Sequence, residues 1–259
     1  MFSDRLCLLL CLLALLCSCS VKEDRNRCPC TVSLNIDRLP AVATVRDGGG
    51  NVLSRTLVET SPAVIEVPHG LLSFSFGAMD SSAEPPADEI FAEDGAVQIE
   101  PGEECPKVWL EYCGAMDTSG ELVELSPVLH RSFALLTLNI VHPEGETVPY
   151  DVSIDGEVDG YGPDCAPSEG AFGVRLAVDE RFSCSLSLPR QRDNSLMLHI
   201  VSGERILRSF ALGETLSANG YDWSAPDLSD IEVTIDYRFS MITLGTDLWS
   251  ISVPLEIVV

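Results

Sequence analysis

Hydrophobic and polar residues alternate along much of the chain after residue 30. A period of two is typical of a half-buried β-strand, because successive side chains point to opposite faces of the sheet. The clearest example is Phe182–Leu188, in which serines separate the apolar residues. The same alternation marks Val32–Ile36, Leu72–Phe76 and Ile231–Tyr237. Arg131–Val141 is longer and more continuously apolar, which predicts a strand that is buried on both faces.

Turn-forming residues separate these segments. The sequence Asp47-Gly-Gly-Gly-Asn51 predicts a hairpin turn between strands at Val42–Arg46 and Val52–Val58. Asp155-Gly156 and Asn219-Gly220 predict two further turns. The acidic, proline-bearing stretch Ser82–Asp94 predicts a loop with room for one helical turn.

Many short strands between Gly, Pro and Asp turns predict an all-β protein built from antiparallel β-sandwiches. We expect a boundary near His142–Pro149, after the long apolar strand. This boundary gives an N-terminal sandwich at residues 31–145 and a C-terminal sandwich at residues 146–259, each of ordinary domain size.

Composition narrows the functional classes. The chain has 259 residues and a formal net charge of −24. Such an acidic surface repels phosphate backbones, which argues against nucleic acid as a partner. No GxSxG, HExxH or P-loop motif is present, and the four histidines are scattered, so we expect no enzyme and no cofactor.

The N-terminus predicts a lipoprotein. Leu8–Leu16 is too short to span a membrane but suits the apolar core of a signal peptide. Leu16-Cys17-Ser18-Cys19 reads as a lipobox, so residues 1–18 are expected to be removed, leaving palmitate-type acyl chains on Cys19 and a tether at residues 19–30. Each buried methylene contributes roughly 0.8 kcal/mol, so several chains hold a protein firmly on a membrane. The alternative is an ordinary secretory signal cut nearby.

Six cysteines remain after Cys19: Cys28, Cys30, Cys105, Cys113, Cys165 and Cys184. An even number in an exported protein allows disulfides. One hypothesis pairs Cys28 or Cys30 with Cys105 or Cys113, and Cys165 with Cys184. The other treats all six as small buried hydrophobic residues. No CxxC or CxxH pairs are present, so no zinc site is expected.

Two further patterns have competing interpretations. Asp155-Gly-Glu-Val-Asp159-Gly160 matches the first half of a calcium loop, but Ala166 stands where a bidentate Glu is needed, which favours an acidic turn over a metal site. Three tryptophans offer a glycan platform. We expect Trp109 and Trp249 to lie in the core and Trp223, in a turn-like segment, to be partly exposed.

The C-terminus carries a candidate strand-exchange segment. Six apolar residues alternate with others up to the last position: Trp249, Ile251, Val253, Leu255, Ile257 and Val259. Pro254, which lies between two of them, suits an edge strand because it has no N–H to donate. This segment is either the last strand of its own sandwich or a strand that pairs with a partner.

Several motifs are informative when taken together: Cys19–Cys30, Val123–Ala134, Asp159–Tyr161 with Glu169–Phe172, Leu188–Gln191 with Asp193–Leu198, and Leu212-Gly213 with Gly220–Trp223 and Asp227–Asp230. In this combination they resemble the FimB-type fimbrial anchor lipoproteins of Bacteroidota, the anchors of type V pili. Lys22, Glu23 and Asp24 resemble the acidic signal that exports lipoproteins of that phylum to the cell surface. The motifs are spread over nearly the whole chain after residue 18.

The resemblance implies two transthyretin-like sandwiches and no catalysis. It also implies a surface-facing lipoprotein of the outer membrane that anchors a fimbria and limits its length. Its partner would be a fimbrillin-like stalk subunit, engaged by β-strand addition. The alternative function is a surface lipoprotein that binds a glycan or host ligand through exposed aromatic residues such as Tyr221 and Trp223.

Overall fold

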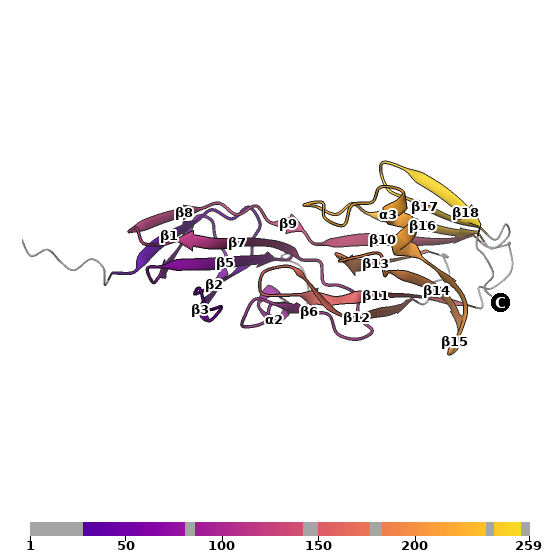
Figure 1. The fold of residues 1–259 in the computed structure, drawn as a ribbon, viewed down its shortest axis with the longest axis horizontal. Coiled ribbons are helices and arrows are strands. Elements are labelled where there is room, and N and C mark those ends of the chain that lie inside the picture. Colours follow the sequence, from indigo (N-terminus) through magenta and orange to yellow (C-terminus); the bar gives the residue numbers. More distant parts are fainter. Residues whose placement is uncertain (1–27, 81–85, 142–149, 177–182, 237–240, 255–259) are drawn as a thin grey trace, which may run out of the picture.

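A computed structural model describes residues 28–80, 86–141, 150–176, 183–236 and 241–254. Two β-sandwiches lie end to end along the long axis of the molecule (Figure 1). Strand β1 belongs to the sandwich at one end, and β17 and β18 reach toward the opposite end. The expected all-β architecture is confirmed.

The N-terminal sandwich has two sheets. The smaller has the order β4–β1–β8, with β1 at Cys30–Leu34, β4 at Ala63–Val67 and β8 at Leu122–Leu125. The larger has the order β3–β2–β5–β7–β9, with β2 at Ala41–Arg46, β3 at Val52–Val58, β5 at Leu71–Ala78, β7 at Trp109–Asp117 and β9 at His130–Arg131. Between β5 and β7 lie the single-turn helix α2 (Ala87–Ile90) and the short strand β6 (Val97–Gln98).

The C-terminal sandwich also has two sheets. One has the order β13–β10–β16–β17–β18, with β10 at Phe133–Val141, β13 at Ser183–Pro189, β16 at Ile231–Asp236, β17 at Met241–Gly245 and β18 at Ser250–Pro254. The other has the order β12–β11–β14–β15, with β11 at Asp151–Tyr161, β12 at Pro167–Leu176, β14 at Met197–Ser202 and β15 at Arg205–Phe210. Helix α3 (Leu212–Ala218) follows β15.

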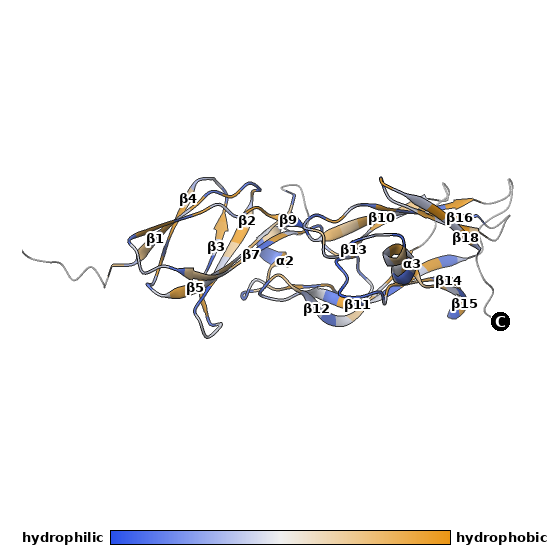
Figure 2. Ribbon diagram, turned by 45° about the horizontal axis from the view of Figure 1, so that its top comes forward, coloured by the Kyte–Doolittle hydropathy of each residue, from blue (hydrophilic) through white to orange (hydrophobic). Residues whose placement is uncertain are grey.

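The predicted alternation places apolar residues in the core. On β5, Leu72, Phe74 and Phe76 are buried, and the two phenylalanine rings stack with centroids 6.3 Å apart. Each fully buried side chain of this size contributes about 1.5–3 kcal/mol. Figure 2 shows hydrophobic residues concentrated along the strands of both sandwiches.

Local turn chemistry explains the β2–β3 hairpin, which is confirmed. Asp47 Oδ1 accepts hydrogen bonds from the N–H groups of Gly49 and Asn51, at 2.8 and 2.9 Å. Gly50 has a φ of 83°, a conformation that glycine adopts at little cost. Asn219-Gly220 likewise forms a turn, at the end of α3.

Two other predictions about chain organisation are wrong. Asp155-Gly156 is not a turn, because both residues lie inside β11 and pair with β12. The expected boundary at residue 145 assigns the long apolar strand to the N-terminal sandwich, whereas β10 pairs with β13 and β16 of the C-terminal one. The chain passes from one sandwich to the other at Ser132, between β9 and β10. The predicted burial of this strand on both faces is also wrong, because buried and half-buried residues alternate along β10 after Ala134. An apolar strand fits either core, so its composition does not select its partners.

Among the described residues, no helix combines the length and the apolar character needed to cross a membrane.

Candidate functional site

Several predicted site residues lie outside the described residues. These are the lipidation site, the export signal and the end of the strand-exchange segment: Cys19, Lys22, Glu23, Asp24, Leu255, Ile257 and Val259. Their roles remain predictions.

The disulfide hypothesis is wrong in the structure. Cys28, Cys30, Cys105, Cys113 and Cys165 all carry free thiols, which excludes both of the predicted pairings, including that of Cys165 with Cys184 on β13. Cys30 and Cys105 are buried. Burial raises the pKa of the Cys105 thiol and raises that of Cys165 to about 12. Such thiols stay protonated at neutral pH and behave as small hydrophobic groups.

The described part of the C-terminal segment forms an edge strand. β18 pairs antiparallel with β17, and Trp249, Ile251 and Val253 pack partly buried against the core. Pro254 ends the strand opposite Met241. Among the described strands, none pairs with the other side of β18. An edge strand presents unpaired backbone groups and is the usual place at which a partner adds a strand.

The exposed-aromatic hypothesis is wrong for Tyr221 and Trp223. Their side chains are only 7% and 8% exposed, and their rings meet edge to face with centroids 4.6 Å apart. The Tyr221 hydroxyl donates to the carbonyl of Ser229 at 2.7 Å, and burial raises its pKa. Trp109 is buried as expected, in edge-to-face contact with Phe133. The turn-like segment around Trp223 therefore packs its rings inward and offers no platform to a glycan.

Asp155 and Asp159 do not form a calcium loop. Both lie on β11, where Asp155 contacts the His199 ring at 3.2 Å and Asp159 accepts a hydrogen bond from Ser168 at 3.0 Å. Within the described ranges, no three metal-ligating side chains come together.

The structure instead brings many predicted motifs together where the sandwiches join. Ser132 is buried at the point of passage between them. Its N–H donates to the carbonyl of Val108 at 3.1 Å. Its carbonyl accepts hydrogen bonds from the Tyr161 hydroxyl and from the backbone N–H of Arg190, the latter at 3.1 Å. Both backbone groups of the linker are thus satisfied, which fixes its conformation.

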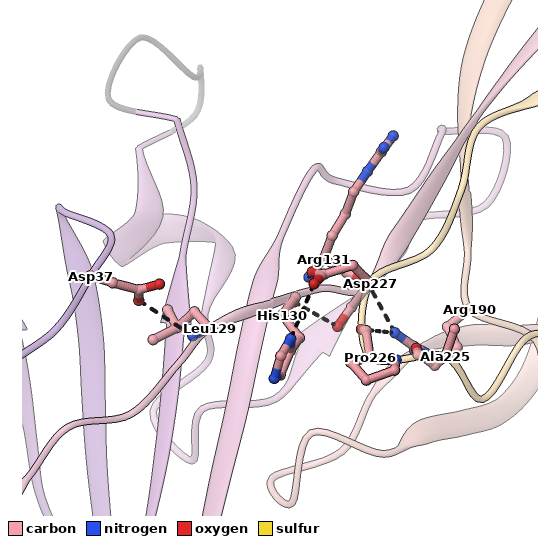
Figure 3. Close-up of polar contacts among 9 residues, drawn as sticks. Asp37, Leu129, His130, Arg131, Arg190, Ala225, Pro226 and Asp227 are labelled. Carbon is pink, nitrogen blue, oxygen red and sulfur yellow. Dashed lines mark hydrogen bonds and ion pairs between the residues drawn. The ribbon is translucent and has the colours of Figure 1, made fainter. Parts of the chain in front are cut away.

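Arg190 is the centre of this junction. It directly follows β13, and its guanidinium donates to four backbone carbonyls (Figure 3). These belong to Trp223 and Ala225 at 2.6 Å each, Pro226 at 2.8 Å and Arg131 at 3.1 Å. Burial lowers the pKa of the guanidinium, but an arginine keeps its charge in proteins. The side chain therefore ties the segment after α3 to the linker.

Carboxylates hold the same linker from two directions. Asp227 Oδ1 accepts the N–H of Arg131 at 2.7 Å, and its other oxygen lies 3.3 Å from the His130 ring (Figure 3). The hydrogen bond from Arg131 lowers the pKa of Asp227, with a smaller contribution from His130. On the N-terminal side, Asp37 accepts the N–H of Leu129 at 3.3 Å.

A second segment joins the sandwiches. β6 comes from the N-terminal half of the chain but pairs with β11 of the C-terminal sandwich. The N–H of Ile99 continues this pairing to the Asp159 carbonyl at 2.8 Å, and that of Cys105 reaches the Ser187 carbonyl at 3.1 Å. Two separate chain segments therefore connect the sandwiches, and each is hydrogen-bonded, so we infer that their relative orientation is fixed.

Sequence reasoning missed the roles of Ser132, Tyr161 and Arg190. The family resemblance rests in part on three motifs: Asp159–Tyr161, Leu188–Gln191 and Asp227–Asp230. In the structure, each of the three contributes a residue to the junction or to its immediate surroundings. Their joint occurrence was the available signal that these segments lie close together.

The fold and this junction define a class: an elongated all-β protein of two hydrogen-bonded sandwiches. Within that class, three solved structures are similar over nearly their whole length. A candidate polysaccharide-binding protein from Bacteroides thetaiotaomicron is 14% identical, with 86% of this chain and 98% of that chain covered, at a TM-score of 0.60. The fimbrial anchor protein Mfa2 from Porphyromonas gingivalis is 11% identical, with 86% of this chain and 99% of that chain covered, at a TM-score of 0.56. A candidate adhesin from Bacteroides ovatus is 13% identical, with 90% of this chain and 97% of that chain covered, at a TM-score of 0.55.

No protein-family model and no curated protein matches the chain. The similarity to the solved structures shows a shared fold.

Proposed function

We propose that this protein is a non-catalytic cell-surface lipoprotein that anchors a fimbria to the outer membrane and limits its length. The observation that carries the proposal is the two-sandwich fold, which spans 99% of a fimbrial anchor protein of P. gingivalis. The N-terminal lipobox, with Cys19 as the acylated residue, supports it by supplying a means of membrane attachment.

The arrangement suits a mechanical link. The N-terminal sandwich, to which the lipidated tether leads, lies at one end of the molecule, and β18 lies in the sandwich at the other end (Figure 1). A stalk subunit that adds a strand beside β18 would therefore be held away from the membrane. The two segments that cross the junction would transmit force between the attachment points.

The lipid is tested by substituting Cys19→Ala and measuring fimbrial protein in cells and in the medium. We expect the substituted protein to leave the membrane fraction and long fimbriae to be shed into the medium. Substitution of exposed Cys28→Ala is the matched control, which should leave both distributions as in the parent. An unchanged distribution in the Cys19→Ala cells would contradict the anchor function.

The contribution of the strand-exchange residues beyond β18 is tested by truncating the chain after Pro254. This change removes Leu255, Ile257 and Val259 but leaves β18 and its pairing with β17 in place. We expect an unchanged melting temperature of the purified protein and loss of surface-attached fimbriae. If the truncated chain folds and still retains fimbriae, those three residues take no part in partner binding.

A further inference from the structure

A cleft of about 570 Å³ lies between the two sandwiches, away from β18. Its walls come from the β2–β3 turn, the end of β7 and the β11–β12 turn, with Arg46, Tyr112, Ala115 and Asp164 among the lining residues. This volume is within the range of about 300–1,000 Å³ that is typical of small-molecule sites.

The backbone around this cleft is unusual. Among the described residues, two that are not glycine have a positive φ: Ala115 at 50° and Cys165 at 62°. Ala115 lines the cleft, and Cys165 follows the lining residue Asp164. The Cys165 thiol bridges the sandwiches by contacting the Glu111 carbonyl at 3.5 Å. Residues in strained conformations cluster at functional sites, because the surrounding structure must hold them there.

An aromatic side chain is exposed in this cleft. Tyr112 is 41% exposed, on the face of the sheet that it shares with Ser75. A β-bulge lies next to it, where the pairing of β7 with β5 shifts register between Leu72 and Phe74. A Cβ atom at Gly114 would lie 3.1 Å from the Tyr112 ring, so the absence of a side chain there lets the ring rest against the backbone. Bulges often redirect a side chain at a binding site.

Polar groups of both hydrogen-bonding kinds line the cleft beside this ring. Arg46 is only 5% exposed and donates to the Ser75 hydroxyl at 3.2 Å and to the Asp94 carbonyl. Among the described carboxylates, none forms an ion pair with it. Asp94 and Asp164 each accept one backbone N–H through Oδ1, at 3.1 Å, which leaves the second oxygen as an acceptor. A buried arginine has five N–H donors, so Arg46 retains some for a ligand.

These features distinguish between ligand classes. Strands β2 and β5 have a partner on each side, whereas β7 pairs with β9 only at Trp109 and Leu110. On the remaining part of β7, the Cys165 thiol already donates to the Glu111 carbonyl, and the test below includes a peptide array for this reason. Asp47, Asp94 and Asp164 repel an anion. A neutral sugar fits both kinds of lining: its C–H face packs on an aromatic ring, whose face is weakly negative, and its hydroxyls both donate and accept.

We propose that this cleft binds a neutral oligosaccharide, with one sugar ring on Tyr112 and hydroxyl groups bonded to Arg46, Asp94 and Asp164. The site takes residues from both sandwiches, so it exists only while the junction holds them in place. It is independent of membrane anchoring and of β18, and is tested on the purified protein.

The test applies the purified protein to an array of neutral, sialylated and sulfated oligosaccharides, and then titrates the strongest ligand by calorimetry. We expect binding to neutral oligosaccharides, a loss of at least 10-fold in affinity for Tyr112→Ala, and retention for Tyr112→Trp. Leu122→Ala is the matched control, since Leu122 is 59% exposed on β8, outside the cleft lining, and should bind as the parent does.

Circular dichroism of each variant confirms that it is folded, which is expected because Tyr112 contributes little to the core. The proposal is overturned if no neutral oligosaccharide binds, if only the acidic oligosaccharides bind, or if folded Tyr112→Ala binds as tightly as the parent. Binding to a peptide array without binding to sugars would likewise overturn it.

Discussion

Two of the places where the sandwiches meet contain an arginine, and the surroundings of the two arginines differ. At the linker, the Arg190 guanidinium donates to four backbone carbonyls. At the cleft, Arg46 is more deeply buried than Arg190, yet it has two hydrogen-bond partners beside a volume of about 570 Å³. A buried arginine is stabilising only where its donors are satisfied.

This difference separates a structural role from a binding role. The linker fixes how one sandwich lies against the other, because the N–H and the carbonyl of Ser132 and the N–H of Arg131 each have a partner on a different element. The cleft uses that fixed geometry to keep Tyr112 and Asp164, from different sandwiches, around one space. If the comparison holds, substitutions at the linker should reduce stability most, and substitutions in the cleft should reduce it least.

The largest effect is expected for Arg190→Met, which keeps much of the aliphatic stem but removes the guanidinium. The carbonyls of Trp223, Ala225 and Pro226 then lose their donor, the first two of them in a partly buried place. We expect the free energy of unfolding to fall by about 3 kcal/mol, measured by urea denaturation at pH 7.

Arg192→Met is the matched control for that experiment. Arg192 pairs with Glu169 at 2.9 Å, but the two side chains are 47% and 80% exposed. Exposed ion pairs contribute about 0–1 kcal/mol, so the control should barely change stability. Equal losses for the two arginines would show that the linker has no special role.

A smaller effect is expected for Tyr161→Phe. The Tyr161 hydroxyl donates to the Ser132 carbonyl and accepts the Arg190 N–H at 2.9 Å, and burial raises its pKa. Removing it leaves the Arg190 N–H with one acceptor, so we expect a loss of about 1–2 kcal/mol in the same assay. Tyr112→Phe, at the exposed cleft, should leave the unfolding midpoint unchanged. If Tyr161→Phe unfolds at the same urea concentration as the parent, the Tyr161 hydroxyl does not stabilise the junction.

The two places also differ in how far the sequence predicts them. Local signals work well: the Asp47–Asn51 turn and the alternation beside it give β3 at Val52–Val58, with the bounds found in the structure. Partners of a strand are set by distant parts of the chain. The apolar run that becomes β10 fits either sandwich core, and pairing with β16, about a hundred residues later, decides between them.

The junction is harder to predict for the same reason. Arg190 lies 33 residues from its acceptor Trp223 and 59 from its acceptor Arg131, so no short motif contains the interaction. At Trp223 a local signal is present but leads to a wrong prediction of exposure. Its Gly, Asp, Ser and Pro neighbours are typical of an exposed turn, yet the turn folds its aromatic rings inward against the core. Turn chemistry predicts the backbone but does not predict which way a large side chain points.

The smallest of these effects is expected at acidic pH, where the Asp227 carboxylate becomes protonated. It separates the contributions of two contacts at the linker. Asp227 has its pKa lowered in the folded state, chiefly by the hydrogen bond from Arg131. Its ionised form is therefore favoured by folding, so its contribution is present above the unfolded-state pKa of about 3.9 and is lost as pH falls through the lower folded-state value. The Asp227 side chain is 63% exposed, so solvent screening keeps this contribution below about 1 kcal/mol.

Asp227→Asn should therefore flatten the decline in stability between about pH 5 and pH 2, measured by urea denaturation at closely spaced pH values. His130→Ala keeps the Arg131 hydrogen bond, which is the larger cause of the shift, and should retain most of the decline. If His130→Ala flattens the curve as much as Asp227→Asn does, the ion pair rather than the backbone hydrogen bond holds the carboxylate. The linker would then depend on salt in the same way as an exposed surface contact, because charge pairs in water are screened and a backbone hydrogen bond is far less so.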